Sequence, residues 1–152
     1  MIRNTSLEYR LAGEIGGGSM AKSIVLVDDF PLTLQFIEYH LEQAGYTDII
    51  KFENPLDVIS YIQNGNNPLV IVTDFQMPQM NGVELLDHIR SNLGVIPAII
   101  TTADHSSLTP GADLYPILEK GSSNFIADLL VLLKKLTSVS KVICITDTSC
   151  IP

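Results

Sequence analysis

The chain has 152 residues and lacks both long apolar runs and clusters of basic residues. None of its apolar runs approaches the ~20 residues that a membrane-spanning helix needs. With no Lys/Arg cluster and a formal net charge of −8, the chain would repel the phosphates of a nucleic acid. We therefore expect no membrane span and no direct binding of nucleic acid.

Cysteine is also scarce in this chain. Cys144 and Cys150 are the only two, and neither has the spacing to a second Cys or His pair that a zinc site requires. The sequence therefore predicts neither a disulfide framework nor a zinc site. The N-terminal residues lack the continuous apolar segment of a signal peptide, so a cytoplasmic location is the default expectation.

The length and composition predict one domain with tails. Hydrophobic residues make up 46% of the chain and charged residues 17%, so the chain can bury a core. We place the domain at residues 22–137. Residues 138–152 are expected to form a C-terminal extension, in which 141–147 loosely repeat the pattern of 22–28 and predict an extra strand or a frayed tail.

Residues 1–21 contain Gly16-Gly17-Gly18-Ser19-Met20 near their end. Glycine and serine favour a flexible chain, so we interpret this segment as a flexible tail or a cloning-derived extension. The near-helical spacing of Leu7, Leu11 and Ile15 leaves a short docking helix as the alternative.

Short β-branched runs alternate with helical patterns throughout the domain. This alternation is the signature of a doubly wound α/β fold, in which helices cover both faces of a parallel sheet. Between the last two predicted strands the segment is short and contains Pro110, so we expect the fourth helix to be short or absent. The pattern predicts five strands, at residues 23–27, 48–52, 69–73, 98–102 and 114–119.

Polar residues follow the predicted strands at the edge where open parallel sheets bind ligands. Three neighbouring carboxylates repel one another unless a cation neutralises them, and an all-oxygen set suits Mg²⁺. A carboxylate beside Mg²⁺ can attack a phosphoryl group while a hydroxyl and an ammonium bind its other oxygens. The pattern therefore indicates a phosphoryl-transfer site. Its residues, in chain order, are Asp28, Asp29, Asp74, Thr102 and Lys120.

This constellation resembles the receiver domains of two-component response regulators over about residues 22–136. The most specific parts are the pair Asp28-Asp29 and the stretch 74–82, DFQMPQMNG, which looks like the phosphoacceptor loop. The resemblance implies a flavodoxin-like sheet with strand order 2-1-3-4-5. It also implies a signalling switch rather than an enzyme, with self-phosphorylation and slow autodephosphorylation as its only reactions.

The resemblance further implies which residues hold the metal ion. Asp74 would be both the phosphoacceptor and a ligand of Mg²⁺. Asp29 would be a direct Mg²⁺ ligand with Asp28 assisting, and the backbone carbonyl of Gln76 would be a further ligand.

Two other residues would bind the phosphoryl oxygens. By resemblance, Thr102 would supply the switch hydroxyl and Lys120 the cation, and Thr101 would replace Thr102 if the strand register shifted by one. The phosphoryl donor would be a sensor histidine kinase or a histidine phosphotransfer protein. The downstream partner would be a protein that the sequence does not identify.

The chain departs from the family pattern after the fourth predicted strand. Ile117 stands where the family often has an aromatic switch residue, and Gly121 stands where a proline usually follows the lysine. We therefore expect the output to use ordering of residues 104–114. One alternative is a phosphorylation-independent pseudo-receiver that only binds a partner protein. A second, an aspartyl-phosphate hydrolase, is disfavoured because no segment is long enough to form a lid.

Overall fold

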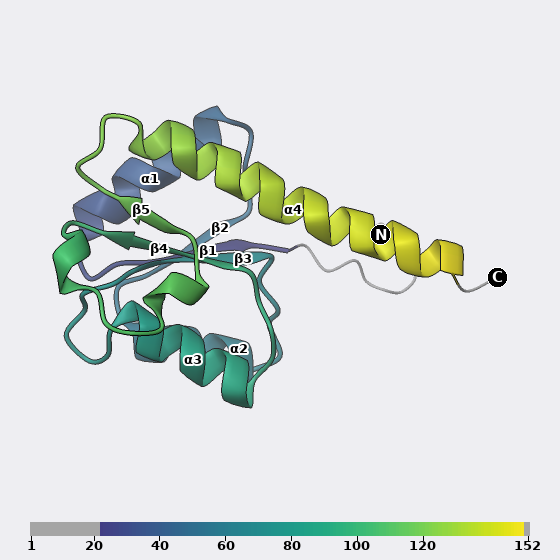
Figure 1. The fold of residues 1–152 in the computed structure, drawn as a ribbon, viewed down its shortest axis with the longest axis horizontal. Helices are drawn as coiled ribbons and strands as arrows, with labels where there is room; N and C mark the ends of the chain where they lie inside the picture. Colours follow the sequence, from purple (N-terminus) through teal and green to yellow (C-terminus); the bar gives the residue numbers. More distant parts are fainter. Residues whose placement is uncertain (1–21, 151–152) are drawn as a thin grey trace, which may run out of the picture.

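A parallel five-stranded sheet forms the centre of the computed structural model (Figure 1). The structure describes residues 22–150, with side chains through Ser138, and the expectations for residues 1–21 lie outside this range. The strand order is β2-β1-β3-β4-β5 with parallel neighbours, so the predicted flavodoxin-like order is confirmed. The strands are β1 (Ile24–Val27), β2 (Ile49–Phe52), β3 (Val70–Asp74), β4 (Ala98–Thr102) and β5 (Ile117–Glu119).

The three inner strands are apolar runs because both faces of the sheet are covered. Every residue of β1, β3 and β4 is buried, and polar residues occur only at the carboxyl ends of β3 and β4. The edge strands are more exposed, and β5 has only three residues, preceded by Pro116. Proline lacks the backbone N–H that a central strand needs, so it suits the edge position of β5.

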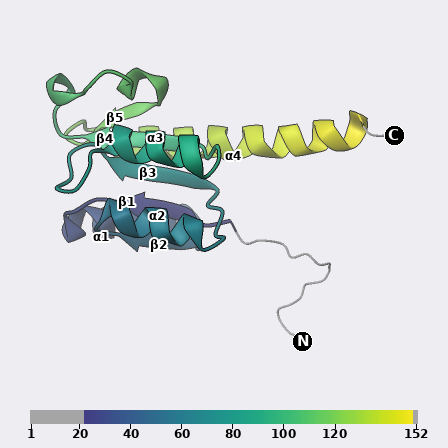
Figure 2. The same cartoon turned by 90° about the horizontal axis from the view of Figure 1, so that it is seen from below.

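In the described part of the chain, four α-helices cover the sheet in two layers (Figures 1 and 2). They are α1 (Pro31–Gln43), α2 (Pro55–Gln63), α3 (Gly82–Asn92) and α4 (Phe125–Cys150). Helices α1 and α4 pack on one face, and α2 and α3 pack on the other. Successive strand residues alternate between the two cores, so Leu26 packs with α1 and α4 whereas Val27 packs with α2 and α3.

Capping residues fix where α2 and α3 begin. The Asn54 side chain accepts a hydrogen bond from the backbone N–H of Leu56 at 2.9 Å, and Pro55 occupies the first turn of α2. Asn81 and Glu84 form a reciprocal capping box at the start of α3. The loop between β3 and α3 therefore has a defined end close to the carboxyl edge of the sheet.

The connection between β4 and β5 contains two short 3₁₀ turns, η1 (His105–Ser107) and η2 (Ala112–Leu114). No α-helix lies between these strands, both of which are within the described residues, so the prediction of a short or absent fourth helix is confirmed. Leu108 and Ala112 pack against the same core as α3. This connection therefore covers less of the α3 face of the sheet than an α-helix would.

The C-terminal extension differs from the expectation. Helix α4 runs from Phe125 to Cys150, so the extra strand considered for residues 141–147 is wrong. No Gly or Pro lies between the ends of α4 to stop the helix. Its second half projects beyond the sheet (Figure 2). None of the helices in the described part of the chain has the length and apolar character needed to cross a membrane.

Candidate functional site

Three carboxylates meet at the carboxyl end of the sheet. Asp28 and Asp29 follow β1, and Asp74 is the last residue of the neighbouring strand β3. One carboxylate oxygen from each of them lies within 4.8 Å of the other two. Asp28 and Asp74 are buried, whereas Asp29 is exposed. The structure thus brings together the acidic residues that the sequence indicated.

Both carboxylate oxygens of Asp28 have a partner. Oδ1 accepts a hydrogen bond from the backbone N–H of Phe30 at 2.9 Å, and Oδ2 accepts one from Lys120 Nζ at 2.6 Å. The Asp28 side chain is only 3% exposed. A buried carboxylate needs such contacts to compensate for the water that it has lost.

Lys120 connects the ends of three strands. Its backbone N–H donates to the Thr102 carbonyl at 2.8 Å, which extends the pairing of β4 with β5. Its Nζ lies 2.6 Å from Asp28 Oδ2 and 3.0 Å from Asp74 Oδ1. Burial alone would lower the pKa of Lys120, but the hydrogen bond to Asp28 and the charge of Asp74 outweigh this effect and raise the pKa. Lys120 therefore stays charged beside both carboxylates.

The surroundings of Asp74 disfavour its ionised form. Burial raises the pKa of Asp74 and the charge of Asp28 raises it further, although Lys120 opposes both effects. The smallest contribution comes from Asp29. A second cation beside these carboxylates would therefore favour the ionised form of Asp74.

Helix α3 begins directly against the backbone of Asp74. A Cβ atom at position 82 would lie 2.6 Å from the Asp74 carbonyl oxygen, so glycine is required there. The Gly82 N–H also donates to the Phe75 carbonyl at 2.8 Å, which closes the loop after β3. The sequence indicated Gly82 only as the last residue of the stretch 74–82 that looks like the phosphoacceptor loop. Its close approach to Asp74 depends on the packing of α3, which no local pattern reveals.

The Thr102 hydroxyl is bonded to the loop that follows β4. Its Oγ1 donates to the Asp104 carbonyl at 3.0 Å and accepts from the Asp104 N–H at 3.1 Å. In the sheet register Asp74 is paired with Thr101, whose hydroxyl donates to the Thr73 carbonyl at 3.5 Å. Thr102 thus lies at the predicted strand end, but its two side-chain hydrogen bonds go to Asp104 rather than to Asp74.

Asp104 is a residue of the site that the sequence reasoning missed. Its carboxylate accepts hydrogen bonds from the hydroxyl and the backbone N–H of Ser106, and these bonds lower the pKa of Asp104. The side chain caps η1 in this way. An Asp two residues before a Ser is a common turn signal, so this contact could have been predicted.

A shallow hollow adjoins Asp29. It is lined by Gln76 and Met77 from the loop after β3 and by Thr109 from the connection after β4. Asp29 and Gln76 therefore face a common space, as ligands of one ion would have to do. Thr109 brings residues of the β4–β5 connection to the border of the same space.

The donor set suits a hard divalent cation. The three clustered side chains offer carboxylate oxygens, which Mg²⁺ prefers, and no Cys or His belongs to the described cluster. The three carboxylates and the Lys120 ammonium together leave two negative charges. A divalent ion would neutralise them, so the residues present fit Mg²⁺.

Comparison with known proteins identifies similar sequences. The sequence model of the response regulator receiver domain matches residues 24–126, which include all the residues of this site. The chain is 28% identical to chemotaxis protein CheY1 of Helicobacter pylori over 105 residues, which cover 68% of this chain and 82% of that protein. It is 26% identical to a chemotaxis protein CheY homolog of Campylobacter jejuni over 105 residues, with coverage of 68% and 78%.

Solved structures show the same likeness. The response regulator TrrA of Thermotoga maritima, solved in complex with Mg(2+)-BeF, is 27% identical, with a TM-score of 0.66 and coverage of 76% of this chain and 98% of that one. The receiver domain of the Francisella response regulator 1452 is 28% identical, with a TM-score of 0.66 and coverage of 78% and 98%.

Proposed function

Because this chain belongs to the response regulator receiver domain family, we propose that it is a CheY-like switch in which Asp74 accepts a phosphoryl group. The observation that carries the proposal is the position of Lys120, whose Nζ lies 3.0 Å from Asp74 Oδ1 and 2.6 Å from Asp28 Oδ2. A cation at this point can neutralise the oxygens of a phosphoryl group attached to Asp74.

In the proposed reaction, a carboxylate oxygen of Asp74 attacks the phosphorus of a phosphohistidine. The new O–P bond forms as the P–N bond breaks, and the imidazole leaves and takes up a proton. Asp74 then carries a mixed anhydride of a carboxylic and a phosphoric acid. The Lys120 ammonium, which first pairs with the Asp74 carboxylate, then pairs with the phosphoryl oxygens that carry the negative charge. Attack of water on phosphorus later releases inorganic phosphate and restores Asp74.

Asp28, Asp29, Asp74 and the backbone carbonyl of Gln76 are the proposed ligands of Mg²⁺. When bound, Mg²⁺ would offset negative charge on the transferring oxygens. The net charge of −2 on the carboxylates and Lys120 supports this assignment, as does the similar protein TrrA, which was solved in complex with Mg(2+)-BeF.

Thr102 is the proposed switch hydroxyl. To donate to a phosphoryl oxygen, it would have to leave the Asp104 carbonyl, to which it now donates at 3.0 Å. This exchange would break one of the bonds that hold the start of the β4–β5 connection. Thr109 in the same connection borders the hollow beside Asp29, which supports the proposal that residues 104–114 reorder around the phosphoryl group.

The proposed donor is a sensor histidine kinase or a histidine phosphotransfer protein. The exposed apolar side chains of Phe30, Leu32 and Phe36 lie at the start of α1 and form a shallow pocket with Lys120 and Phe125. An apolar patch beside the reactive group suits transient docking of a protein donor. The net charge of −8 argues that the downstream partner is a protein rather than a nucleic acid. A cytoplasmic location remains our expectation.

One observation favours the alternative of a pseudo-receiver that binds its partner without phosphorylation. Ile117 is half-buried at the start of β5 and packs against the core formed with α2 and α3. Its branched side chain is stiff about its first torsion and cannot swing as an aromatic ring would. An output surface that never changes would be compatible with such a residue.

Labelling with a small phosphodonor distinguishes the two functions. We expect the wild type to gain one phosphoryl mass in the presence of Mg²⁺ and not with a chelator, and Asp74→Asn to gain none. Asp57→Asn, which changes an exposed aspartate in the first turn of α2, is the matched control and should be labelled like the wild type. Labelling of Asp74→Asn would move the acceptor elsewhere. Failure of the wild type to be labelled would favour the pseudo-receiver.

A further inference from the structure

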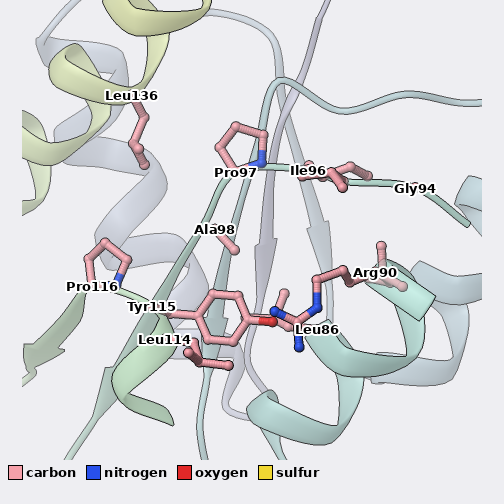
Figure 3. Close-up of a pocket in the computed structure, with 12 residues that line it drawn as sticks. Leu86, Arg90, Gly94, Ile96, Pro97, Ala98, Leu114, Tyr115, Pro116 and Leu136 are labelled. Carbon is pink, nitrogen blue, oxygen red and sulfur yellow. The ribbon is translucent and has the colours of Figure 1, made fainter. Parts of the chain in front are cut away.

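An apolar groove lies at the amino ends of β4 and β5 (Figure 3). The carboxylates lie at the other end of the strands. Leu86 of α3 and Ala98 of β4 form part of its lining, with Leu114 and Tyr115 before β5 and Leu136 of α4. Its volume is about 240 Å³. An apolar cavity of ~150 Å³ can hold benzene, so this groove has room for apolar side chains.

The groove is open because the connection between β4 and β5 contains no α-helix. In a doubly wound fold, the helix of each crossover covers part of one sheet face. Here the two 3₁₀ turns leave Leu114 62% exposed, and Val95, which also lines the groove, is 86% exposed. An amphipathic segment that packed on the groove would complete the cover.

Polar contacts hold one wall of the groove in place. The Tyr115 hydroxyl donates to Asp87 Oδ1 at 3.3 Å, and Arg90 donates to the same oxygen at 3.0 Å. The Arg90 guanidinium also lies 5.9 Å from the centre of the Tyr115 ring. The groove is therefore formed before anything binds, and a cationic group stands on its rim.

We propose that the N-terminal segment of this same chain occupies the groove through Leu7, Leu11 and Ile15. Residues four apart lie on one face of a helix, so these three side chains would form a single apolar stripe. Glu8 and Glu14 would flank the stripe on its two sides. Their carboxylates would complement the charge of Arg90 on the rim of the groove.

The segment is long enough to reach the groove. It joins the described structure at Lys22, two residues before β1. Because the sheet is parallel, β1 and β4 start at the same edge, with Ile24 paired to Val70 and Ala98 paired to Ile71. Two strand spacings amount to ~10 Å. Residues 16–22 can span up to ~23 Å when extended, which leaves the stripe free to dock.

The proposed helix would form only as it docks. A helix of this length is marginal by itself, and Gly13 weakens it further. The tether compensates for this cost because a short linker gives an effective concentration on the order of millimolar. Weak contacts in the groove are therefore sufficient.

Hydrogen exchange of the complete chain tests the proposal. The stripe variant Leu7→Asp/Leu11→Asp should exchange several-fold faster than the wild type in residues 86–98 and 112–117. The matched control Ile2→Asp/Tyr9→Asp adds the same charge away from the stripe and should exchange like the wild type. Leu114→Asp, which places a charge in the groove, should make the effect of the stripe variant disappear.

Other outcomes would overturn the proposal. Equal exchange in the wild type and the stripe variant would mean that the N-terminal segment does not cover the groove. Protection that increases with protein concentration would assign the groove to a second copy of the chain instead. The experiment uses unphosphorylated protein, so its result is independent of whether Asp74 accepts a phosphoryl group.

Discussion

Lys120 Nζ lies 2.6 Å from Asp28 Oδ2, so the residue after the edge strand β5 is fixed to the residue after the inner strand β1. The same ammonium lies 3.0 Å from Asp74 at the end of β3. The charge balance of the site therefore depends on strands that are far apart in the sequence. Removing any one of these three charged side chains therefore changes the electrostatic free energy of the other two.

Lys120→Met should destabilise the protein because Asp28 stays buried without its cation. Removing one partner of a buried ion pair costs up to ~5 kcal/mol. Since the Lys120 side chain is 21% exposed, we expect a loss of about 2 kcal/mol in urea unfolding. Lys51→Met, which breaks a more exposed ion pair with Glu38, should cost less than ~1 kcal/mol. Equal losses of unfolding free energy in the two variants would show that the burial of Asp28 does not add to the cost.

Asp74→Asn should raise the melting temperature of the metal-free protein at neutral pH by a few degrees. The folded-state pKa of Asp74 is raised by burial and by Asp28, so stability is lost as the pH rises from the unfolded value to the folded pKa, and it stays lost above that pKa. Below the unfolded value of 3.8, the carboxyl is protonated in both states and the advantage should vanish. Thermal unfolding from neutral to acid pH with a chelator measures this. A gain independent of pH would point to packing instead of charge.

Gly82→Ala should cost about 2 kcal/mol, because the new methyl group would lie 2.6 Å from the Asp74 carbonyl oxygen and force α3 away. The displacement should also slow phosphorylation of Asp74. Gly121→Ala is the matched control, since no atom lies within 4 Å of a Cβ at that position. Urea unfolding of the two variants compares them directly. A harmless Gly82→Ala would contradict the close contact.

Asp29→Ala should weaken Mg²⁺ binding by at least ~10-fold in calorimetric titration. It should change the stability of the metal-free protein little, because Asp29 is exposed and contributes least to the raised pKa of Asp74. Glu42→Ala removes the same charge from an exposed position on α1 and serves as the control. Equal Mg²⁺ affinity in both variants would remove Asp29 from the ligand set.

A stable phosphoryl mimic should slow hydrogen exchange in residues 104–114. The expected cause is the transfer of the Thr102 hydroxyl from Asp104 to the mimic, followed by ordering of the connection around it. Thr102→Ala should abolish the protection while leaving binding of the mimic measurable. If exchange changes in α4 and not in residues 104–114, the output does not use this connection.

The strands and the acidic residues could be predicted because their signals are local. Each inner strand is a mainly apolar run, and parallel packing alone brings Asp28 and Asp74 to the same edge. The direction of the Thr102 hydroxyl could not be predicted, since it depends on how the next loop folds. Residues 141–147 are apolar and β-branched enough to suit a strand or a helix, and continuity with α4 decides for the helix.

Helix α4 has 26 residues, which at the usual rise gives a length of about 39 Å. Phe125, Leu129 and Leu133 are buried and clamp its first half to the sheet, close to Lys120, while the rest projects (Figure 2). Because only the first half of α4 is packed, a small tilt of that half displaces the far end of the helix by a larger distance. A tilt of about 5° at the clamp moves the far end by about 3 Å at this length. Small adjustments around Lys120 are therefore magnified along α4.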